Sequence, residues 1–407
     1  MLKAGDGPVR HATMRERNLA VLFGEVRAHQ PVTRARLAAL TGFTKTTVSN
    51  LIAILADAGL VRDGEPVQDA ERGRPGVAVT VNAEGGAGLG LEINVDYLAA
   101  CVVDLGWRVR YRHLVAADNR GRSPEAIVAA LSRLSTRAVA SAAEQGLSVA
   151  GAVVAVPGVL DRTHVLRAPN LGWSDVPIAE LLREGLPQLR LPVEQDNEAN
   201  LAALGELWFG VGESLGDFLH VSGEIGIGAG VIVGGQVFRG GHGSAGELGH
   251  ITVEPDGPPC ACGGRGCLER IAGQEAILRA AGLTDVIAGS AAGPKESVSA
   301  LVNLLESGDP RALEAVRAAG RTLGGALADA VKLLDPQTVV LGGIFSPLAR
   351  WVRPEVEAGL RERALYGTVP SVVVSPLGGD AAVLGAAGLV IKRIYADPAL
   401  LLRRSPI

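Results

Sequence analysis

TRARLAALTGFTKTTVSNLIAILADAG, residues 33–59, predicts two short helices joined by a tight turn. The first helix begins at Thr33, whose hydroxyl can cap it, and stops before Gly42. The second is capped by Thr44 and ends near Ala58. Helix, glycine turn and helix in this order are typical of a helix-turn-helix. The apolar residues that the second helix would bury recur at helical spacing: Val48, Leu51, Ile52 and Leu55.

The residues on both sides of this stretch complete a winged helix. A charged loop follows Leu60 and Val61, and GRPGVAVTVN at 73–82 is typical of the return strand of a β-wing, with Arg72 and Arg74 at its tip. We therefore predict a winged helix-turn-helix domain, with its wing and linker, over residues 1–82. The first helix of this domain would be amphipathic and would precede Thr33, with its apolar stripe at Leu19, Leu22, Phe23 and Val26.

The face of the second helix that points away from this core carries small hydrogen-bonding side chains. Asn50 can pair with an adenine edge, and Lys45 with guanine or phosphate. Arginines beside a flat Gly or Pro backbone suit a narrow minor groove or its phosphates. The alternatives are a merely solvated hairpin and a winged helix that binds protein. The predicted contacts to double-stranded DNA are Arg34, Lys45, Thr46, Ser49, Asn50, Arg72 and Arg74.

Composition and charge fit a globular DNA-binding protein. The chain has 407 residues, 47% of them hydrophobic, and a net charge of −4. Residues 1–80 hold 11 Lys+Arg against 8 Asp+Glu, and the remainder holds 28 against 35, although chance could produce this asymmetry. The first 23 residues are charged where a signal peptide needs an apolar core, and no stretch approaches the roughly 20 apolar residues of a membrane span. We expect a cytoplasmic protein.

The remaining chain, residues 83–407, predicts two similar α/β lobes. Three strands from about Gly88, a helix, a strand, a helix and a strand are followed by a second round that begins at DFLHVSG. Lobe one is expected at about 88–197 plus 381–396, and lobe two at about 198–380. Such an arrangement puts a ligand cleft between the lobes, near the strand ends.

Three of the four cysteines lie within eight residues of one another, in the pattern H-x9-C-x-C-x4-C. Thiolates and imidazole on a glycine-rich turn suit a closed tetrahedral Zn²⁺ site, which would be structural because no position is left for water. The alternatives are a reactive thiol pair and three merely buried cysteines. Cys101, alone in an apolar run, is expected in the core. The predicted ligands are His250, Cys260, Cys262 and Cys267.

Seven stretches occur in the order of a known family: VPGVL, APNLGW, DNEANLAALGE, GSAGELGHITV, CACGGRGCLE, VVLGG and GDAAVLGAA. With them the chain resembles the repressor, open reading frame, kinase (ROK) family nearly from end to end. The resemblance implies a winged helix followed by a sugar-kinase-like α/β body with the two-lobed actin and hexokinase type of fold, which is ribonuclease H-like.

The resemblance also implies the chemistry of the site. It gives the same four zinc ligands, with the histidine binding metal through one ring nitrogen and facing a sugar with the other. Carboxylates and amides suit a ring of hydroxyls, each of which is both donor and acceptor. The alternative for Glu247 and Glu269 is that they are plain surface acids. The implied sugar-binding residues are Gly158, Asn170, Asn197, Glu198, Glu247, His250 and Glu269.

The phosphate-binding motifs of the family's kinases are altered. ROK kinases open the body with Asp-x-Gly-Gly-Thr, where this chain has Glu-Ile-Asn-Val-Asp at 92–96, and the second phosphate loop contains Glu224. The residue that matches the kinases' catalytic aspartate is Glu198, one methylene longer, although Asp196 could substitute for it. We therefore expect that this protein is not an enzyme and has no catalytic residues.

These patterns predict a sugar-responsive transcriptional regulator, most simply a repressor. It would act as a homodimer or tetramer on a two-fold DNA operator, with a sugar in the cleft as effector. One alternative is an ATP-dependent hexose kinase with a DNA-binding head. Another is a DNA-binding scaffold whose body binds a protein such as a phosphotransferase component.

Overall fold

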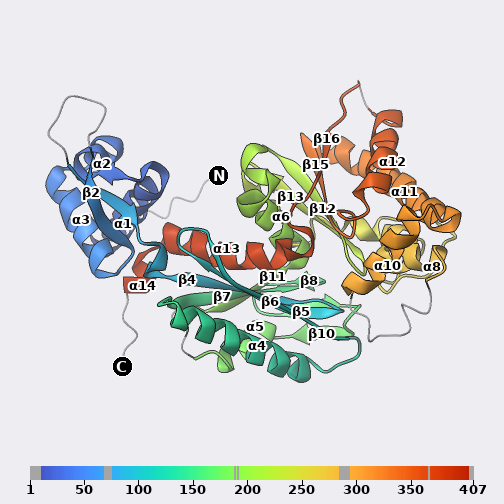
Figure 1. The fold of residues 1–407 in the computed structure, drawn as a ribbon, viewed down its shortest axis with the longest axis horizontal. Helices are drawn as coiled ribbons and strands as arrows, with labels where there is room; N and C mark the ends of the chain where they lie inside the picture. The colour runs from blue at the N-terminus through green and yellow to red at the C-terminus, as the bar shows by residue number, and fades with distance from the viewer. Residues whose placement is uncertain are drawn as a thin grey trace, which may run out of the picture.

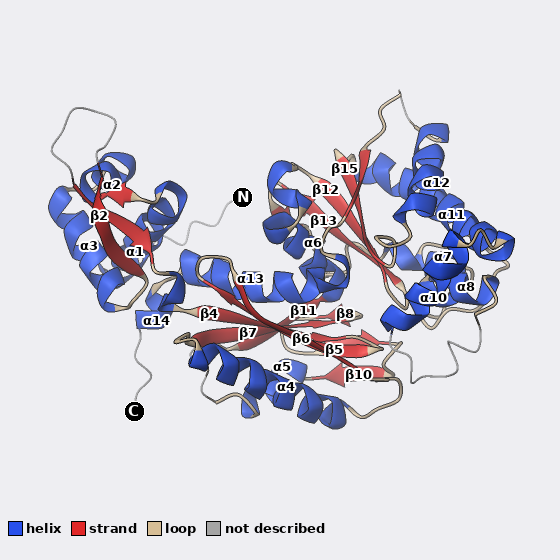
Figure 2. Ribbon diagram, viewed as in Figure 1, coloured by secondary structure: helices blue, strands red, loops and turns tan. Residues whose placement is uncertain are grey.

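The computed structural model describes residues 11–67, 76–187, 189, 192–283, 294–364 and 367–402. Over these ranges the chain forms a small N-terminal unit and two five-stranded sheets with helices packed against them (Figures 1 and 2). The N-terminal unit lies at one end of the molecule, beside helices α13 and α14 (Figure 1). The predicted DNA contacts Arg72 and Arg74 lie outside the described residues.

The N-terminal unit packs three helices on a three-stranded sheet of order β1-β3-β2. Thr33 Oγ1 accepts a hydrogen bond from the Arg36 backbone N–H at 3.2 Å, and so caps α2 as expected. Gly42 ends α2 with a φ of 72°, the left-handed conformation that favours glycine. The elements are α1 (His11–His29), β1 (Val32–Thr33), α2 (Arg34–Thr41), α3 (Lys45–Asp57), β2 (Val61–Val67) and β3 (Gly76–Val81).

The start of α3 is also capped as the sequence predicts. Thr44 Oγ1 accepts a hydrogen bond from the backbone N–H of Thr47 at 3.1 Å. The predicted apolar stripes of α1 and α3 are confirmed, since these side chains are at most 5% exposed: Leu19, Leu22, Phe23, Val26, Val48, Leu51, Ile52 and Leu55.

One local expectation is wrong. The charged run after Val61, expected as a loop, is mostly strand, because β2 pairs antiparallel with β3 along residues 61–67. The pairing shifts register between Asp63 and Pro66. Partnership with β3 therefore outweighs the low strand propensity of these charged residues.

The first large sheet has the order β11-β7-β4-β5-β6. β4, β5 and β6 form an antiparallel meander, and β7 and β11 continue the sheet parallel to β4. Helix α4 packs on β4 and β5, and α5 packs against β11. The elements are β4 (Ala87–Ile93), β5 (Tyr97–Asp104), β6 (Val109–Ala116), α4 (Pro124–Glu144), β7 (Val149–Val156), α5 (Ile178–Glu184) and β11 (Val193–Asn197), after a short 3-10 turn, η1 (Ala83–Gly85).

The second sheet repeats this topology in the order β14-β13-β12-β15-β16. β12, β13 and β14 are antiparallel, and β15 and β16 lie parallel to β12. Two similar α/β halves are therefore present, as expected. The elements are β12 (Phe218–Gly223), β13 (Ile227–Val233), β14 (Gln236–Val237), α11 (Pro310–Leu334), β15 (Thr338–Gly343), α12 (Ala349–Glu362) and β16 (Ser371–Val374).

Two helices, α6 (Glu198–Phe209) and α13 (Ala381–Ala396), lie between the sheets and cross in direct contact. α6 packs on β12 and β13, while α13 packs on β4, β5 and β7. A Cβ on Gly385 of α13 would lie 1.8 Å from the carbonyl oxygen of Leu201 in α6. Glycine at this position therefore allows the backbones of α6 and α13 to come into close contact. This contact connects the two halves of the body.

Several elements carry no expectation from the sequence. A small antiparallel sheet of order β10-β9-β8 flanks the first sheet, and helices α7, α8 and α10 lie beside α11. They comprise β8 (Val159–Leu160), β9 (Val165–Ala168), β10 (Trp173–Val176), η2 (Val211–Ser214), η3 (Leu248–His250), α7 (Leu268–Ala272), α8 (Gln274–Ala280), α10 (Pro294–Glu306), η4 (Gly378–Asp380) and α14 (Ala399–Leu402).

Candidate functional site

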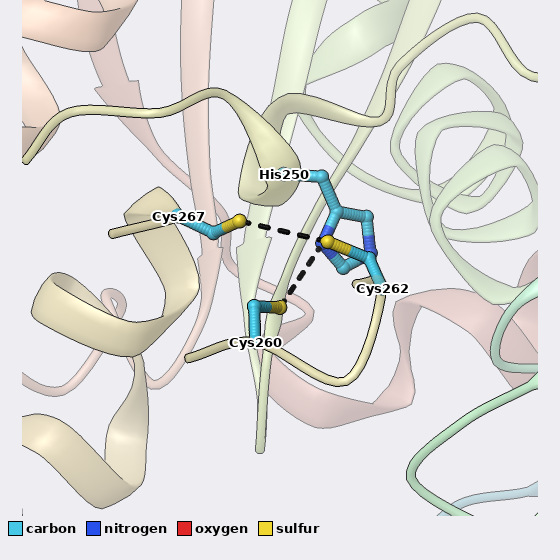
Figure 3. Close-up of side chains that lie close together, drawn as sticks. All are labelled: His250, Cys260, Cys262 and Cys267. Carbon is cyan, nitrogen blue, oxygen red and sulfur yellow. Dashed lines mark hydrogen bonds between the residues drawn. The ribbon is translucent and has the colours of Figure 1, made fainter. Parts of the chain in front are cut away.

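The four predicted metal ligands lie together on the loops around η3 and α7. Figure 3 shows the three sulfur atoms and the imidazole ring of His250 pointing toward one another. One ligand atom from each residue lies within 4.8 Å of all the others. The Sγ atoms of Cys262 and Cys267 are 3.6 Å apart, and Cys260 Sγ is 3.7 Å from His250 Nδ1.

The loop closes tightly because glycine replaces side chains at its narrowest point. Gly266 has a φ of 59°, and a Cβ there would lie 1.5 Å from the carbonyl oxygen of Glu254. Isolated bridges join Thr252 to Cys267 and Pro259 to Arg265, which brings the two ends of the loop together.

The residues fit zinc. Four tetrahedral ligands with a Zn–S bond of about 2.3 Å would place two sulfur atoms about 3.8 Å apart, close to the 3.6 Å between the Sγ atoms of Cys262 and Cys267. Three sulfur donors and one imidazole nitrogen also form a donor set that zinc prefers. The four residues could therefore hold a metal ion.

His250 lies between this cluster and a neighbouring cleft. Its Nδ1 faces Cys260, whereas its Nε2 is 3.6 Å from a carboxylate oxygen of Glu247. Glu269 touches the cluster as well, because Cys260 Sγ donates to its Oε1 at 3.0 Å. The two ring nitrogens of one side chain thus face the two parts of the site.

All seven residues that the resemblance assigned to a sugar line this one cleft. They come from the β7–β8 and β9–β10 connections, the start of α6, η3 with the residue before it, and the first turn of α7. Four further lining residues were not among the predicted sugar contacts, although each lies within one of the family stretches: Pro157, Gly243, Ala245 and Ala261.

Asn197 holds the cleft together as well as lining it. Its side-chain oxygen accepts hydrogen bonds from the backbone N–H groups of Ala199 at 2.8 Å and Asn200 at 3.2 Å, and so caps α6. Its amide nitrogen donates to the carbonyl oxygen of Gly158 at 2.9 Å. The sequence did not reveal this positioning role, because a short motif does not show which partners an amide will find.

The two acids near the start of α6 have different surroundings. Burial, and then the charge of Glu247, raise the pKa of Glu198 to about 7, and its Oε2 is buried without a hydrogen-bond partner among the described residues. Asp196 instead forms an ion pair with Arg239 and is not among the residues that line the cleft. Asp196 is therefore poorly placed to substitute for Glu198.

The predicted DNA-reading face of α3 is exposed. The side chains of Lys45, Thr46, Ser49 and Asn50 all point to solvent. Arg34 on α2 is committed to a different contact, because its guanidinium donates to Asp63 on β2 at 2.8 Å and 3.2 Å.

The comparisons with known proteins place the chain. Residues 88–393 match the sequence profile of the ROK family. The chain belongs to the ROK family. It is 29% identical over 380 residues to the xylose repressor of Bacillus subtilis strain 168, an alignment that spans 92% of this chain and 94% of that repressor.

Solved ROK structures resemble both the whole chain and its larger part. A ROK family transcriptional regulator, a homologue of the E. coli MLC protein, is 25% identical with a TM-score of 0.77, over 96% of this chain and 98% of its own. A ROK family glucokinase from Streptomyces griseus, in complex with glucose and AMPPNP, is 32% identical with a TM-score of 0.64, over 75% of this chain and 99% of its own. The likeness to the regulator therefore extends much further along this chain.

This ROK chain places two carboxyl groups at the ends of two strands, Glu92 in β4 and Glu224 directly after β12. Glu92 is 2% exposed; Tyr97 donates to its Oε1 at 2.6 Å, and its Oε2 is buried without a partner in the described chain. Burial raises the pKa of Glu92 to about 8. Burial, and then Glu198 and Glu92, hold the pKa of Glu224 well above its usual value. A second cavity next to them is lined by Tyr97, Glu224, Gly343 and Asp380, among others.

The raised pKa of Glu92 predicts a pH-dependent stability. Between pH 4.5 and about 8 the folded chain keeps a proton on Glu92 that the unfolded chain loses, so stability falls as the pH rises through this window. Glu92→Gln keeps the acceptor for Tyr97 and has no such proton. The free energy of unfolding of Glu92→Gln, relative to that of the wild type, should therefore rise by at least about 1 kcal/mol between pH 5.5 and pH 8. Urea unfolding at the two pH values measures this difference.

The control for this experiment is Glu184→Gln at the exposed end of α5. It should retain the pH dependence of the wild type. Equal slopes of stability against pH in the wild type and in Glu92→Gln would show that Glu92 is ionised in the folded protein.

None of the helices in the described parts of the chain is long and apolar enough to cross a bilayer.

Proposed function

We propose that this ROK protein is a sugar-responsive transcriptional repressor. Residues 1–82 would form the winged helix-turn-helix that binds the operator, and residues 83–407 the sugar-binding body. The observation that carries the proposal is that one chain combines a cleft lined by all seven assigned sugar residues with an exposed polar face on α3. The Bacillus subtilis relative is a xylose repressor, so xylose is the first sugar to test.

In the cleft, the proposed sugar contacts are the groups whose polar atoms have room for hydroxyls. Glu247, Glu269, Asn170 and the Nε2 of His250 would bind the hydroxyls. Asn197 would act chiefly by holding Gly158 and the first turn of α6 in place. Glu198 would offer a buried carboxyl group.

Zinc would be held by His250, Cys260, Cys262 and Cys267, and would supply a rigid link between the segments on which these residues lie. With Nδ1 turned to the cysteines, the imidazole of His250 would keep its Nε2 directed into the cleft. The metal site would therefore support sugar binding without taking part in a reaction.

On DNA, the side chains of Lys45, Thr46, Ser49 and Asn50 would reach base edges in the major groove. Arg72 and Arg74 would contact the backbone or the minor groove, which rests on their sequence context alone. A homodimer or tetramer would place two such helices on a two-fold operator.

The alternative function is an ATP-dependent hexose kinase, which the likeness to the glucokinase favours. The buried Glu92 and the partly buried Glu224 oppose it, because a phosphate group there would meet either a negative charge or a protonated acid, and neither supplies the positive charge that phosphoryl transfer needs. A coupled assay of ADP release with glucose and xylose separates the two functions. Turnover at an ordinary enzymatic rate would support the kinase.

The test of the repressor is reciprocal linkage. A DNA fragment is first selected by the protein from a random pool, and xylose and glucose are then titrated calorimetrically with and without that fragment. If sugar releases the repressor, sugar must bind more weakly to the DNA complex, typically by roughly 5- to 150-fold. Equal sugar affinities in the two titrations would contradict sugar-controlled repression.

A further inference from the structure

The N-terminal unit is attached to the body through a cluster of aromatic rings. Trp107, in the turn between β5 and β6, lies edge-on to Trp208 with ring centroids 5.7 Å apart, and 5.5 Å from Phe209. Trp208 and Phe209 form the last turn of α6. The chain has only four tryptophans, and two of them meet here. The end of α6 is therefore fixed against the β5–β6 turn.

Helix α1 of the N-terminal unit packs directly onto this cluster. Phe23 stacks on Tyr395 of α13 at a centroid distance of 4.5 Å. The guanidinium of Arg27 lies 4.9 Å from the centre of the Trp107 ring and 5.0 Å from that of Tyr395. One side chain of α1 thus touches both the β5–β6 turn and α13.

The cluster leaves little room for independent movement. A Cβ on Gly388 of α13 would lie 2.7 Å from Trp208 and 2.9 Å from Phe209, so these rings pack into the space that the glycine leaves. Trp107 has a φ of 63°, uncommon for a residue other than glycine, and its indole nitrogen is buried without a hydrogen-bond partner in the described chain. Close packing of this kind transmits displacement instead of absorbing it.

The other end of α6 lies in the sugar cleft. Asn197 caps the helix and Glu198 begins it, and both line the cleft. α6 has 12 residues, so its two ends are about 18 Å apart. Near its C-terminus, Glu206 is fully buried and accepts hydrogen bonds from Ser375 and from the backbone N–H of Val211, which ties α6 to the end of β16. These contacts attach α6 to the second sheet as well as to α13.

We propose that α6 carries the position of the sugar-bound second sheet to the DNA-binding unit, with Trp107 and Arg27 as positioning residues. Closure of the cleft on a sugar turns α6 against α13, Trp208 and Phe209 displace Trp107, and the contact of Trp107 with Arg27 shifts α1. This inference rests on the proposed function, since it assigns the path by which sugar controls DNA binding.

The test compares two arginine substitutions on the same helix. Arg27→Gln removes the contact with Trp107 and Tyr395, whereas Arg17→Gln removes the same charge from another exposed position of α1. For each protein the affinity for the selected DNA fragment is measured with and without saturating xylose or glucose. The ratio of the two affinities is the readout, because a purely structural or charge effect changes both affinities and leaves their ratio alone.

We expect Arg27→Gln to lower this ratio by roughly 3- to 10-fold, while its sugar affinity and the ratio for Arg17→Gln stay within about twofold of the wild type. Trp208→Phe keeps an aromatic ring but removes part of its contact with Trp107. It replaces Arg27→Gln in the test if that variant fails to fold, and it should lower the ratio in the same way. A responsive wild type with equally responsive variants would overturn the relay and leave the proposed function standing. If the wild type binds a sugar but its affinity for DNA does not change, both the relay and the proposed function are overturned.

Discussion

Cys262→Ser is expected to remove zinc from the protein and most of its sugar affinity with it. A serine hydroxyl stays protonated at neutral pH and replaces a thiolate poorly, so a four-ligand site falls to three. Without zinc, the ring of His250, whose Nε2 faces Glu247 in the cleft, loses the metal bond that would hold it in one orientation. Zinc measured by plasma mass spectrometry should drop from about one ion per chain to a small fraction of that. Affinity for xylose or glucose should weaken by roughly 10- to 100-fold.

Cys101→Ala provides the control, because Cys101 is fully buried in β5, away from the cluster. That variant should keep both its zinc and its sugar affinity. A zinc-free Cys262→Ser protein that binds sugar as tightly as the wild type would show that His250 does not couple the two sites. A wild type purified without chelators and free of zinc would contradict the metal site itself.

The parts of the fold that sequence reasoning predicted well are those that depend on neighbouring residues. Thr33, Gly42 and Thr44 form or end helices through hydrogen bonds that reach no further than four residues along the chain. Val48, Leu51, Ile52 and Leu55 are buried along one side of α3, as their spacing predicts. Local chemistry is sufficient in these cases, because each signal and its structural partner lie in the same turn.

The α/β pattern predicts a cleft between the lobes, but the residues that line it could be predicted only through the family resemblance. Gly158 and Glu269 line the same cavity although 110 residues separate them, and no periodic pattern reports such a meeting. Other contacts between residues far apart in the sequence could not be predicted for the same reason. The ion pair of Asp196 with Arg239 and the stacking of Phe23 on Tyr395 follow from how distant elements pack. Partners of this kind are fixed by tertiary structure, which overrides local propensity.

Asn50→Ala is expected to have the second large effect, on sequence-specific DNA binding. Asn50 is exposed on α3, where its amide can donate to and accept from one adenine edge. Loss of such a bidentate contact costs about 1–3 kcal/mol, or roughly 5- to 150-fold in affinity for the selected fragment. Binding to random DNA depends on phosphate contacts and should change by less than about twofold. Fluorescence anisotropy with both DNAs, at several salt concentrations, measures the two effects.

The matched control is Asn303→Ala, the same substitution at an exposed position of α10 in the body. It should leave both affinities and their salt dependence at the wild-type values. Because Asn50 carries no charge, the slope of affinity against salt should be unchanged in Asn50→Ala as well, which distinguishes a lost base contact from a lost phosphate contact. Equal weakening on selected and random DNA would mean that α3 does not read bases through Asn50.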